Sequence, residues 1–496
     1  MPLTPRAIYK DYVNNDLDKK FAVQLLLILI DDAEKIDTRL ESLKILDKIQ
    51  ADDDITFKHL ENLLISDLNE DVRNLTTTIL KNNYLKKALV PMVWALEHET
   101  SLKCLITVIS TIGEINTRES KEILIAKLRN LTKKEYGKVL KALLKKKKIK
   151  NYSSKELTEV LLNYFVISFL KITFGYFKFE IDTFGLISEL DLSNIERYSS
   201  SQNKLEWFLE SIFSLQHLTK CDLRFNHLTK IPGNIPNSIK NLDLSYNKIE
   251  KLSDFSSFTL INSLNLKSNR LRNLPESLGF LTSLEKLNLR NNVLSNLPRS
   301  LNSISSLKIL DLHGNKFSSL DINLNKSLLE LELGWNNLHF IPKSLEALSS
   351  LEKLGLGGNK LIELPEWFGS YPSLKRLDLY DNKLSKIPES LGFLTSLEKL
   401  NLRNNEIENL PSTFKNLKSL KVLNLSWNNF TSLPDWIGKL SSLEELNLWG
   451  NLIEKLPKSI SALSSLKILD LNFNKFEDSP PFLKEMERRT GLIIKL

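Results

Sequence analysis

The residues of this chain that could do chemistry are a glycine-rich stretch, a column of acids, scattered histidines and cysteines, and a run of lysines. The glycine-rich stretch is GLGGNK, at residues 355–360. A phosphate-binding loop needs a glycine-rich turn that ends in Gly-Lys-Ser or Gly-Lys-Thr, because the lysine and the hydroxyl reach the phosphates and their metal. This stretch lacks that ending, and we interpret it as one unit of a repeat with small exposed residues.

The acids recur at equivalent positions of a repeated pattern: Asp222, Asp243, Asp311, Glu332, Asp378 and Asp470. Paired carboxylates are used in general acid–base catalysis. Here the acids alternate with asparagines at the same position, and we expect them to stand on an open sheet where water reaches all of them. Because such acids lack the burial that shifts a pKa, we expect no acid–base site.

The six histidines and two cysteines show no metal-ligand spacing. Cys221 takes a core leucine position of its repeat, and Cys104 lies in an apolar helix, so both are expected to be buried, unreactive thiols. We therefore predict a protein that is not an enzyme and has no catalytic residue, cofactor or metal.

The lysine run covers residues 133–150 and contains a single acid, Glu135. Five of its lysines follow four- and three-residue steps along one helix face: Lys134, Lys138, Lys141, Lys145 and Lys148. This basic stripe is either a plain solvated face or a surface for an acidic partner, such as lipid headgroups, nucleic acid or an acidic protein. No interleaved aromatic residues favour base stacking.

The elements that must position these residues are repeats. From Leu218 onward the pattern LxxLxLxxNxL returns in twelve units at intervals of 21 to 23 residues. The alternating leucines point into a core and their neighbours to solvent, so each unit supplies one strand of a parallel sheet. The buried asparagine is expected to satisfy backbone groups of its own coil and the next. A thirteenth, degenerate coil starts at Ile187 and has Ile195 where the asparagine should be.

A Leu-Pro or Ile-Pro pair follows in nine units and predicts an extended bend in place of a full convex helix. Two units have Ser253 and Asp321 in place of the proline, and we expect local irregularity there. The string PESLGFLTSLEKLNLRNN occurs at residues 275–292 and again at 388–405, which shows that the array grew by copying its own units.

Over about Leu218 to Phe476 the chain resembles the intracellular leucine-rich-repeat family with the Leu-Pro signature, found in Ras-group scaffold proteins and their plant relatives. The resemblance implies a curved solenoid whose concave sheet binds proteins, often in small-GTPase signalling complexes. No residue of the sequence identifies that partner.

The first part of the chain shows apolar residues at three- and four-residue spacing, which predicts helix after helix. An approximate repeat starts at Asp37, Glu70 and Glu99, at intervals of 33 and 29 residues. This part resembles HEAT-type repeats, which implies a stack of paired helices. Two apolar stretches, residues 21–30 and 161–177, are shorter than the roughly 20 residues that span a bilayer. Both are predicted to be buried helices, and no transmembrane segment is expected.

The fold class is therefore two repeat solenoids, an all-α HEAT-like stack followed by an α/β leucine-rich-repeat arc with a parallel concave sheet. We divide the chain into HEAT-like repeats (1–150), a connecting and capping segment with the degenerate first repeat (151–217), twelve leucine-rich repeats (218–476) and a C-terminal cap (477–496). Two cysteines cannot build a disulfide framework, and the N-terminus lacks the pattern of a signal peptide. These features predict a cytoplasmic protein.

The main binding patch is predicted on the concave face of the later repeats, where large side chains replace the usual Lys, Asn, Asp and Ser. These partner-binding residues are Trp335, Arg376, Tyr380, Arg403, Trp427, Trp449 and Phe473. Trp, Tyr and Arg are the usual anchors of protein interfaces, and Gly355, Gly357 and Gly358 leave a shallow gap among them. The alternative is that the rings merely pack along the turn edge.

The sequence thus predicts a non-enzymatic protein-binding scaffold or adaptor, with the small-GTPase link coming only from the family resemblance. Two alternatives remain open. One is a regulatory subunit of an enzyme, and the other is a membrane-surface or nucleic-acid binder that acts through the basic stripe. The net charge of +8 argues only weakly for an acidic partner.

Overall fold

The computed structural model describes residues 4–131, 149–184, 186–198, 204–231, 235–255, 258–476 and 480–495. The chain divides into two compact units. The first contains Met1–Leu190 and Trp207–Leu218, and the second contains Asp191–Glu206 and Thr219–Leu496. The connecting segment, residues 151–217, is thus divided between the two units.

The first unit is a stack of helices, as the spacing of its apolar residues predicts. Its leading helices are α1 (Pro5–Val13), α2 (Lys19–Asp32), α3 (Ile36–Ile49), α4 (Asp54–Ser66), α5 (Glu70–Tyr84), α6 (Leu89–His98), α7 (Leu102–Ile115) and α8 (Arg118–Leu131). Polar residues begin several of them. The Asp18 carboxylate accepts a hydrogen bond from Phe21 N at 2.8 Å, and Asp53 accepts one from Thr56 N at 2.9 Å. Such caps satisfy N–H groups that have no partner inside the helix.

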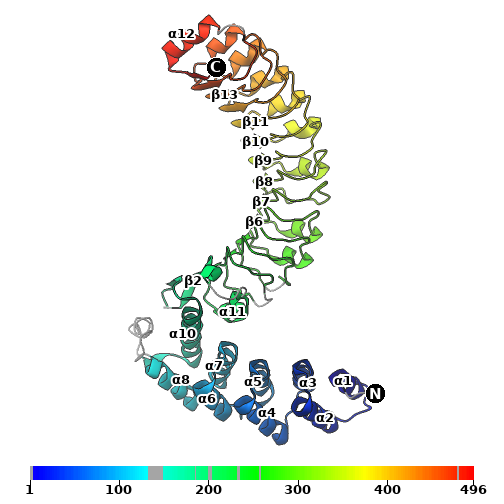
Figure 1. Cartoon of the computed structure of the whole chain (residues 1–496), viewed down its shortest axis with the longest axis vertical. Helices are drawn as coiled ribbons and strands as arrows, with labels where there is room; N and C mark the ends of the chain where they lie inside the picture. Colours follow the sequence, from blue (N-terminus) through cyan, green and yellow to red (C-terminus); the bar gives the residue numbers. More distant parts are fainter. Residues whose placement is uncertain are drawn as a thin grey trace. The chain divides into compact units, whose positions relative to one another are not determined.

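These helices pack in two rows (Figure 1). Helices α3, α5 and α7 form one row, in which each contacts the next, while α2, α4 and α6 pack against them from one side. Each helix of this row begins at or near one copy of the approximate sequence repeat. The repetition in sequence therefore corresponds to a repetition in structure, whereas the HEAT-type assignment stays a prediction.

Two arginines link successive helix pairs of the stack. Arg39 donates from Nε to Ile30 O at 2.6 Å and forms an ion pair with Asp67. Arg73 donates to both carboxylate oxygens of Glu99, at 2.7 and 2.9 Å. Both carboxylates are nearly buried, with 8% and 3% of their side chains exposed. The same contact therefore repeats along the stack and ties each pair of helices to the following pair.

A long apolar helix, α10 (Ser154–Phe174), follows in the first unit. It has 21 residues, of which an 18-residue window has a mean hydropathy of 1.5, and among the described helices it has the length and composition to cross a membrane. The sequence argument that this stretch is too short is therefore wrong, because a capping box of Ser153 and Glu156 starts the helix seven residues before residue 161. Its predicted burial is confirmed, since α10 packs against α7 and α8 and buries side chains such as Leu157 and Leu161.

Shorter elements precede and follow α10 in the sequence, before the first full repeat. They are the 3-10 helices η1 (Ile149–Asn151) and η2 (Ile195–Tyr198), the strands β1 (Lys178–Ile181) and β2 (Ile187–Asp191), and the helix α11 (Lys204–Ile212).

The second unit is a curved stack of coils with a parallel sheet on its inner side (Figure 1). From β3 onward, each strand pairs with the next in chain order. The strands are β3 (Lys220–Asp222), β4 (Asn241–Asp243), β5 (Ser263–Asn265), β6 (Lys286–Asn288), β7 (Ile309–Asp311), β8 (Glu330–Glu332), β9 (Lys353–Gly355), β10 (Arg376–Asp378), β11 (Lys399–Asn401), β12 (Val422–Asn424), β13 (Glu445–Asn447), β14 (Ile468–Asp470) and β15 (Ile493–Lys495).

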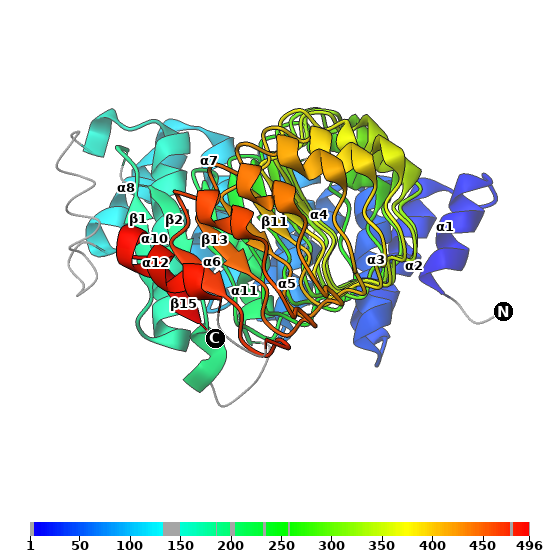
Figure 2. The ribbon, with the colours of Figure 1, turned by 90° about the horizontal axis from the view of Figure 1, so that it is seen from above.

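Short 3-10 helices cover the convex side, opposite the strands (Figure 2). They are η3 (Glu276–Phe280), η4 (Arg299–Ser303), η5 (Lys343–Ala347), η6 (Glu366–Gly369), η7 (Glu389–Phe393), η8 (Ser412–Asn416), η9 (Asp435–Lys439) and η10 (Lys458–Ala462). Each follows a proline, and six of these eight prolines are in the extended conformation, as the Leu-Pro pattern predicts. The fully described coil that has Asp321 in place of the proline has no 3-10 helix, so the expected irregularity is confirmed there.

The core of the second unit is a ladder of leucines in register. Leu354, Leu377 and Leu400 lie in the middle of adjacent strands and pair directly with one another, and all three are buried. Because successive strand residues point to opposite faces, a slip of one residue would turn this ladder out to solvent. The predicted arc with a parallel concave sheet is therefore confirmed.

The repeated asparagine has the predicted structural role. Asn359 Nδ2 donates to Leu333 O at 3.0 Å and to Leu356 O at 2.9 Å, while its Oδ1 accepts from Leu338 N at 3.1 Å. The asparagine thus binds backbone groups of its own coil and of the preceding coil. The sequence predicted its own coil and the following coil, so the second part of that prediction is wrong. These asparagines join each coil to the one before it.

The degenerate first coil continues the same ladder. Leu192 N donates to Asp222 O at 2.8 Å, which matches the contacts between later coils. Ile195 cannot replace an asparagine amide. The adjacent Glu196 has a buried carboxylate that accepts hydrogen bonds from Leu205 N at 2.8 Å and from His227 N at 3.3 Å.

The segment predicted to be the C-terminal cap contains one helix and one strand. The helix is α12 (Pro481–Thr490), which buries Leu483 and Met486, and the strand is β15, which pairs with β14 in register.

Candidate functional site

The concave face presents three outward residues in each coil. The first column contains the first residue of each strand, and the second column contains the third residue of each strand. The third column contains the residue two positions after each strand. In one central coil they are Lys353, Gly355 and Gly357. Because the strands pair in register, residues of one column lie side by side, about 4.8 Å apart.

Five aromatic residues stand at the turn position directly before the structural asparagine. We call them the aromatic ledge: Phe225, Tyr246, Trp335, Trp427 and Phe473. Their φ angles lie between +51° and +57°, a left-handed conformation that costs a residue with a Cβ about 1–2 kcal/mol. Other coils place Gly, Asn, Asp or Ser at this position. The turn itself therefore does not account for the aromatic side chains.

The ledge residues remain open to solvent although some of them touch one another. The exposed fraction is 54% for Trp335, 46% for Trp427 and 78% for Phe473. Trp449, in the third column, packs edge-to-face between two of them, with ring centroids 4.7 Å from Trp427 and 5.4 Å from Phe473. The structure thus brings three of the predicted binding residues into one cluster, and their role in binding a partner stays a prediction.

A second pair of predicted residues meets across an intervening coil. Trp335 Nε1 donates to Tyr380 Oη at 3.1 Å. A Cβ atom added at Gly357 would lie 2.3 Å from Tyr380 Cε1, and one at Gly358 would lie 2.9 Å from the Trp335 ring. The glycines therefore make room for these two rings, and neighbouring side chains partly fill the gap that the sequence predicts.

A hollow of about 330 Å³ lies on the concave face around this gap. Its lining side chains are mostly charged or polar: Arg290, Asp311, His313, Glu332, Lys353, Arg376, Asp378, Tyr380 and Asn401. Lys353 Nζ lies 2.8 Å from Glu332 Oε1, and Arg376 Nε lies 2.8 Å from Asp378 Oδ2. Of the predicted residues, Arg376 and Tyr380 belong to this hollow, whereas Arg403 does not line it.

Sequence reasoning missed most of this hollow. One signal was present: five of the sixteen glycines of the chain fall within residues 314–358. Gly334, Gly355 and Gly357 do not have positive φ angles, so the backbone does not require glycine there. Missing side chains in the middle of an outward column indicate a hollow on the sheet.

Some acids of the second column are less solvated than the sequence predicts. Burial raises the pKa of Asp222, Asp311 and Glu332 above their ordinary values, and Lys353 only partly offsets this for Glu332. The expectation that water reaches every acid of the column is therefore wrong, because side chains from neighbouring strands crowd these three on the curved sheet.

The histidine of the hollow is neutral near pH 7. Burial, together with the nearby charges of Arg290 and Lys267, lowers the pKa of His313 to about 4. Among the described residues, no group of three or more His, Cys, Asp or Glu side chains is placed to hold a metal ion. The hollow therefore offers paired charges and a neutral imidazole for contact with polar groups.

Both cysteines are buried free thiols, as the sequence predicts. Burial raises the pKa of Cys104 to about 12 and also raises the pKa of Cys221. Because the thiolate is the nucleophile, neither residue is activated at neutral pH. The basic stripe, Lys134, Lys138, Lys141, Lys145 and Lys148, lies outside the described residues.

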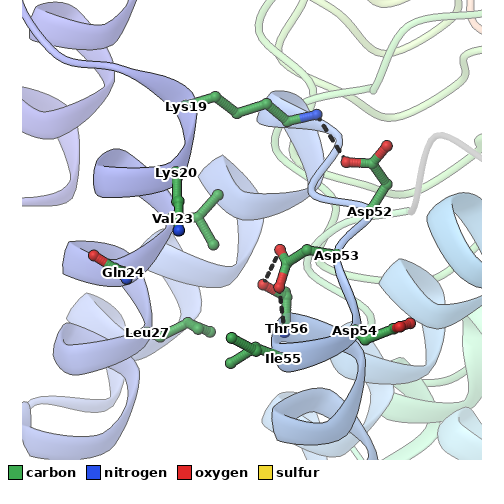
Figure 3. A pocket seen from close by; sticks show the side chains of 10 residues that line it. All are labelled: Lys19, Lys20, Val23, Gln24, Leu27, Asp52, Asp53, Asp54, Ile55 and Thr56. Atoms are coloured by element: carbon green, nitrogen blue, oxygen red, sulfur yellow. Dashed lines mark hydrogen bonds and ion pairs between the residues drawn. The ribbon is translucent and has the colours of Figure 1, made fainter.

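The first unit has a hollow of its own, of about 450 Å³, between α2 and the start of α4 (Figure 3). Its apolar wall includes Leu27 and Ile55 (Figure 3). Lys19 Nζ lies 3.1 Å from Asp52 Oδ1, and the carboxylate of Asp53 caps α4. These polar groups already have structural roles, and no sequence motif pointed to this hollow.

Comparisons with known proteins agree with the geometry of the second unit. The family model described as a leucine-rich repeat region matches residues 366–481. The chain carries a leucine-rich-repeat region. An internalin of Listeria monocytogenes aligns with a TM-score of 0.52 and 24% identity, over 62% of this chain and 86% of the internalin, which shows the same solenoid fold.

Two further proteins are similar to parts of the chain. Human lumican is 38% identical over 77 residues, which are 15% of this chain and 23% of lumican. The chain thus matches about a quarter of the length of that relative. A leucine-rich-repeat protein of Leptospira interrogans is 29% identical and aligns over 62% of this chain and 95% of its own, with a TM-score of 0.45.

Proposed function

We propose that this protein is a non-enzymatic cytoplasmic scaffold that binds another protein on the concave side of its leucine-rich repeats, with the aromatic ledge as the anchor. One observation carries the proposal. Five bulky aromatic residues hold a left-handed backbone conformation that glycine, asparagine, aspartate or serine fills elsewhere, and they expose their rings. The repeat turn imposes this conformation on every coil, and residues that are strained in it are typical of functional positions.

The chemistry of the ledge suits a protein surface. Exposed Trp and Tyr are the most frequent anchors of protein interfaces, because they bury large area at a low cost in conformational entropy. Trp427 and Trp449 hold each other in an edge-to-face contact, so they are already ordered before a partner arrives. Such preorganisation lowers the entropic cost of binding.

The resemblance to Leu-Pro repeats of Ras-group scaffolds nominates small GTPases and their regulators as the first candidates to test. The cytoplasmic placement rests on the two buried free thiols, which suit a reducing compartment. Sustained turnover of nucleotide, ester or peptide by the purified chain would contradict the non-enzymatic part.

The test is the double substitution Trp427→Ala with Trp449→Ala in the full chain. The partner is first identified by affinity purification with mass spectrometry, and its Kd is then measured with purified components. We expect a loss of about 2 kcal/mol or more, which is roughly thirtyfold in Kd. The matched control is Phe393→Ala on the convex η7, where the side chain is 60% exposed. It should leave the Kd unchanged.

The opposite outcome is also clear. If the double substitution leaves the Kd within about threefold while the second unit loses thermal stability, the rings only pack along the turn edge. The binding site would then have to be sought elsewhere on the protein.

A further inference from the structure

Four acids in the outward columns of the concave face lie within ion-pair distance of a neighbouring cation. The pairs are Asp222 with Arg224 at 3.0 Å, Glu332 with Lys353 at 2.8 Å, Asp378 with Arg376 at 2.8 Å, and Asp470 with Lys495 at 3.8 Å. Cations without such a pair are therefore the residues of this face that have charge to offer a ligand.

Two strands carry the same trio of donor side chains across the three columns. They come from the duplicated string and are Lys286, Asn288 and Arg290 on and after β6, and Lys399, Asn401 and Arg403 on and after β11. We call them the first and second donor trios. Among the described residues, no carboxylate lies within ion-pair distance of any of their four cations.

The asparagine of each trio is oriented by the backbone. Asn288 Oδ1 accepts from Arg290 N at 3.0 Å, and Asn401 Oδ1 accepts from Arg403 N at 3.2 Å. The acceptor end of each amide is thus occupied, and no described acceptor binds its Nδ2. Each trio therefore presents hydrogen-bond donors and positive charge at once, which is the chemistry that recognises a carboxylate or another oxyanion.

Each trio has one neighbouring strand that carries no acidic residue on the concave face. The strand before the first trio, β5, has Ser263 and Asn265 in its outward columns, and the strand after the second trio, β12, has Val422 and Asn424. On their other sides lie Asp311 and Asp378. Asp378 is paired with Arg376, as described above. Asp311 accepts a hydrogen bond from His313 N at 3.0 Å and is attracted electrostatically to Arg290 without forming an ion pair with it.

Between the trios, the second column carries acids rather than donors. It reads Asp311, Glu332, Gly355 and Asp378 along β7 to β10. A polyanion with evenly spaced phosphates would have to cross these carboxylates, and like charges repel each other. A protein segment can instead place acidic residues at each trio and neutral or basic residues between them. The Trp427 and Trp449 rings, perpendicular to each other, also do not form the parallel platforms that stack successive bases.

From this pattern we infer that the concave face binds an extended protein segment through two acidic clusters, one at each donor trio. The inference deepens the proposed function and rests on it, because the second trio lies beside the aromatic ledge. The trios are five strands apart, or about 24 Å at the usual strand spacing. An extended chain spans this distance with about seven or eight residues.

The test uses a labelled peptide of about twelve residues, with Glu-Glu at both ends and Gly-Ser between them, and full-length protein. In all proteins the five lysines of the basic stripe are changed to Gln, so that binding there does not mask the result. We expect the two-ended peptide to bind at least about tenfold more tightly than a peptide with Glu-Glu at one end only. Lys399→Glu with Arg403→Glu, or Lys286→Glu with Arg290→Glu, should each remove this advantage.

The control with the same change in net charge is Lys343→Glu with Lys458→Glu, on the convex η5 and η10. It should keep the advantage of the two-ended peptide. The inference is overturned if both trio reversals leave the Kd within about twofold of the parent protein. It is also overturned if oligothymidylate or phosphatidylserine vesicles bind more tightly than the peptide through the same residues, because the partner class would then be wrong.

The proposed function fails in a different way. If the trio reversals have no effect but Trp427→Ala with Trp449→Ala still releases the purified partner, the acidic segment is wrong and the aromatic anchor stands. If the aromatic substitutions leave the partner bound while the peptide still requires the trios, the anchor is wrong and the acidic segment stands.

Discussion

The Arg73 guanidinium and the Glu99 carboxylate face each other fork to fork in the first unit, joined by two hydrogen bonds of 2.7 and 2.9 Å. Burial alone would raise the pKa of Glu99, but the hydrogen bonds from Arg73 and Ser101 N outweigh burial and lower that pKa to about 2. This contact joins α5 to the end of α6 and leaves little of either charged group in water.

Arg73→Ala should strongly destabilise the first unit, because it leaves a buried carboxylate without its cation. We expect a loss of about 3–5 kcal/mol in the free energy of unfolding, measured by urea denaturation with helical circular dichroism. Arg73→Lys should cost less but should not restore the parent value, since an ammonium cannot make the two-pronged contact. Equal stability of all three proteins at pH 7 would show that the pair contributes nothing.

The same pair predicts a pH dependence. Since the pKa of Glu99 is lower in the folded chain than its ordinary value of 4.5, its contribution is present above about pH 4.5 and is lost as the pH falls toward 2. The unfolding free energy of the parent protein should therefore fall over this window. Arg73→Ala should show a smaller decrease over the same window, measured by urea titrations at several pH values.

Asn359→Ala should destabilise the second unit. The alanine removes the amide that binds Leu333 O, Leu356 O and Leu338 N, and unpaired buried backbone groups cost about 1–3 kcal/mol each. We expect a total loss of about 3 kcal/mol or more in urea denaturation. Asn302→Ala on the exposed surface of η4 is the control and should stay within about 0.5 kcal/mol of the parent.

Gly369→Ala should separate two neighbouring coils on the convex side. Its Cβ would lie 2.1 Å from Ser390 O, so the backbone of one coil must move, at a cost of about 1–3 kcal/mol. Gly491→Ala is the comparison, because its φ is +70° with no atom within 4 Å of the new Cβ. It should cost only about 1–2 kcal/mol for backbone strain. If Gly369→Ala melts at the parent temperature, the coils are less tightly stacked than these distances indicate.

A fragment that starts at Leu218 should aggregate, whereas one that starts near Tyr152 should remain soluble. The shorter fragment lacks residues 191–206, which belong to the second unit, and uncovers the first full coil. In that coil, Asn226 Nδ2 donates to Leu192 O at 2.9 Å. Light scattering and thermal melting compare the two fragments. A soluble, cooperatively melting monomer from the shorter fragment would show that residues 151–217 are not the cap.

The sequence alone determined the repeats, because their physical causes act within a few residues. Alternating leucines predict strands with one buried face, and the asparagine at a fixed distance after them predicts the turn. The prolines predicted the absence of full convex helices, and the missing proline at Asp321 predicted the irregular coil. The helical first unit followed from its three- and four-residue spacing in the same way.

Only the tertiary structure decided what surrounds each outward side chain. The Trp335 to Tyr380 hydrogen bond joins residues 45 positions apart. The hollow is lined by residues from Arg290 to Asn401, and neighbouring coils bury Asp311 and Glu332. Sequence spacing fixes which column a residue joins, but the pKa of an acid depends on how closely the neighbouring coils crowd it. The donor trios likewise became visible only when the ion pairs of the other strands on the concave face were known.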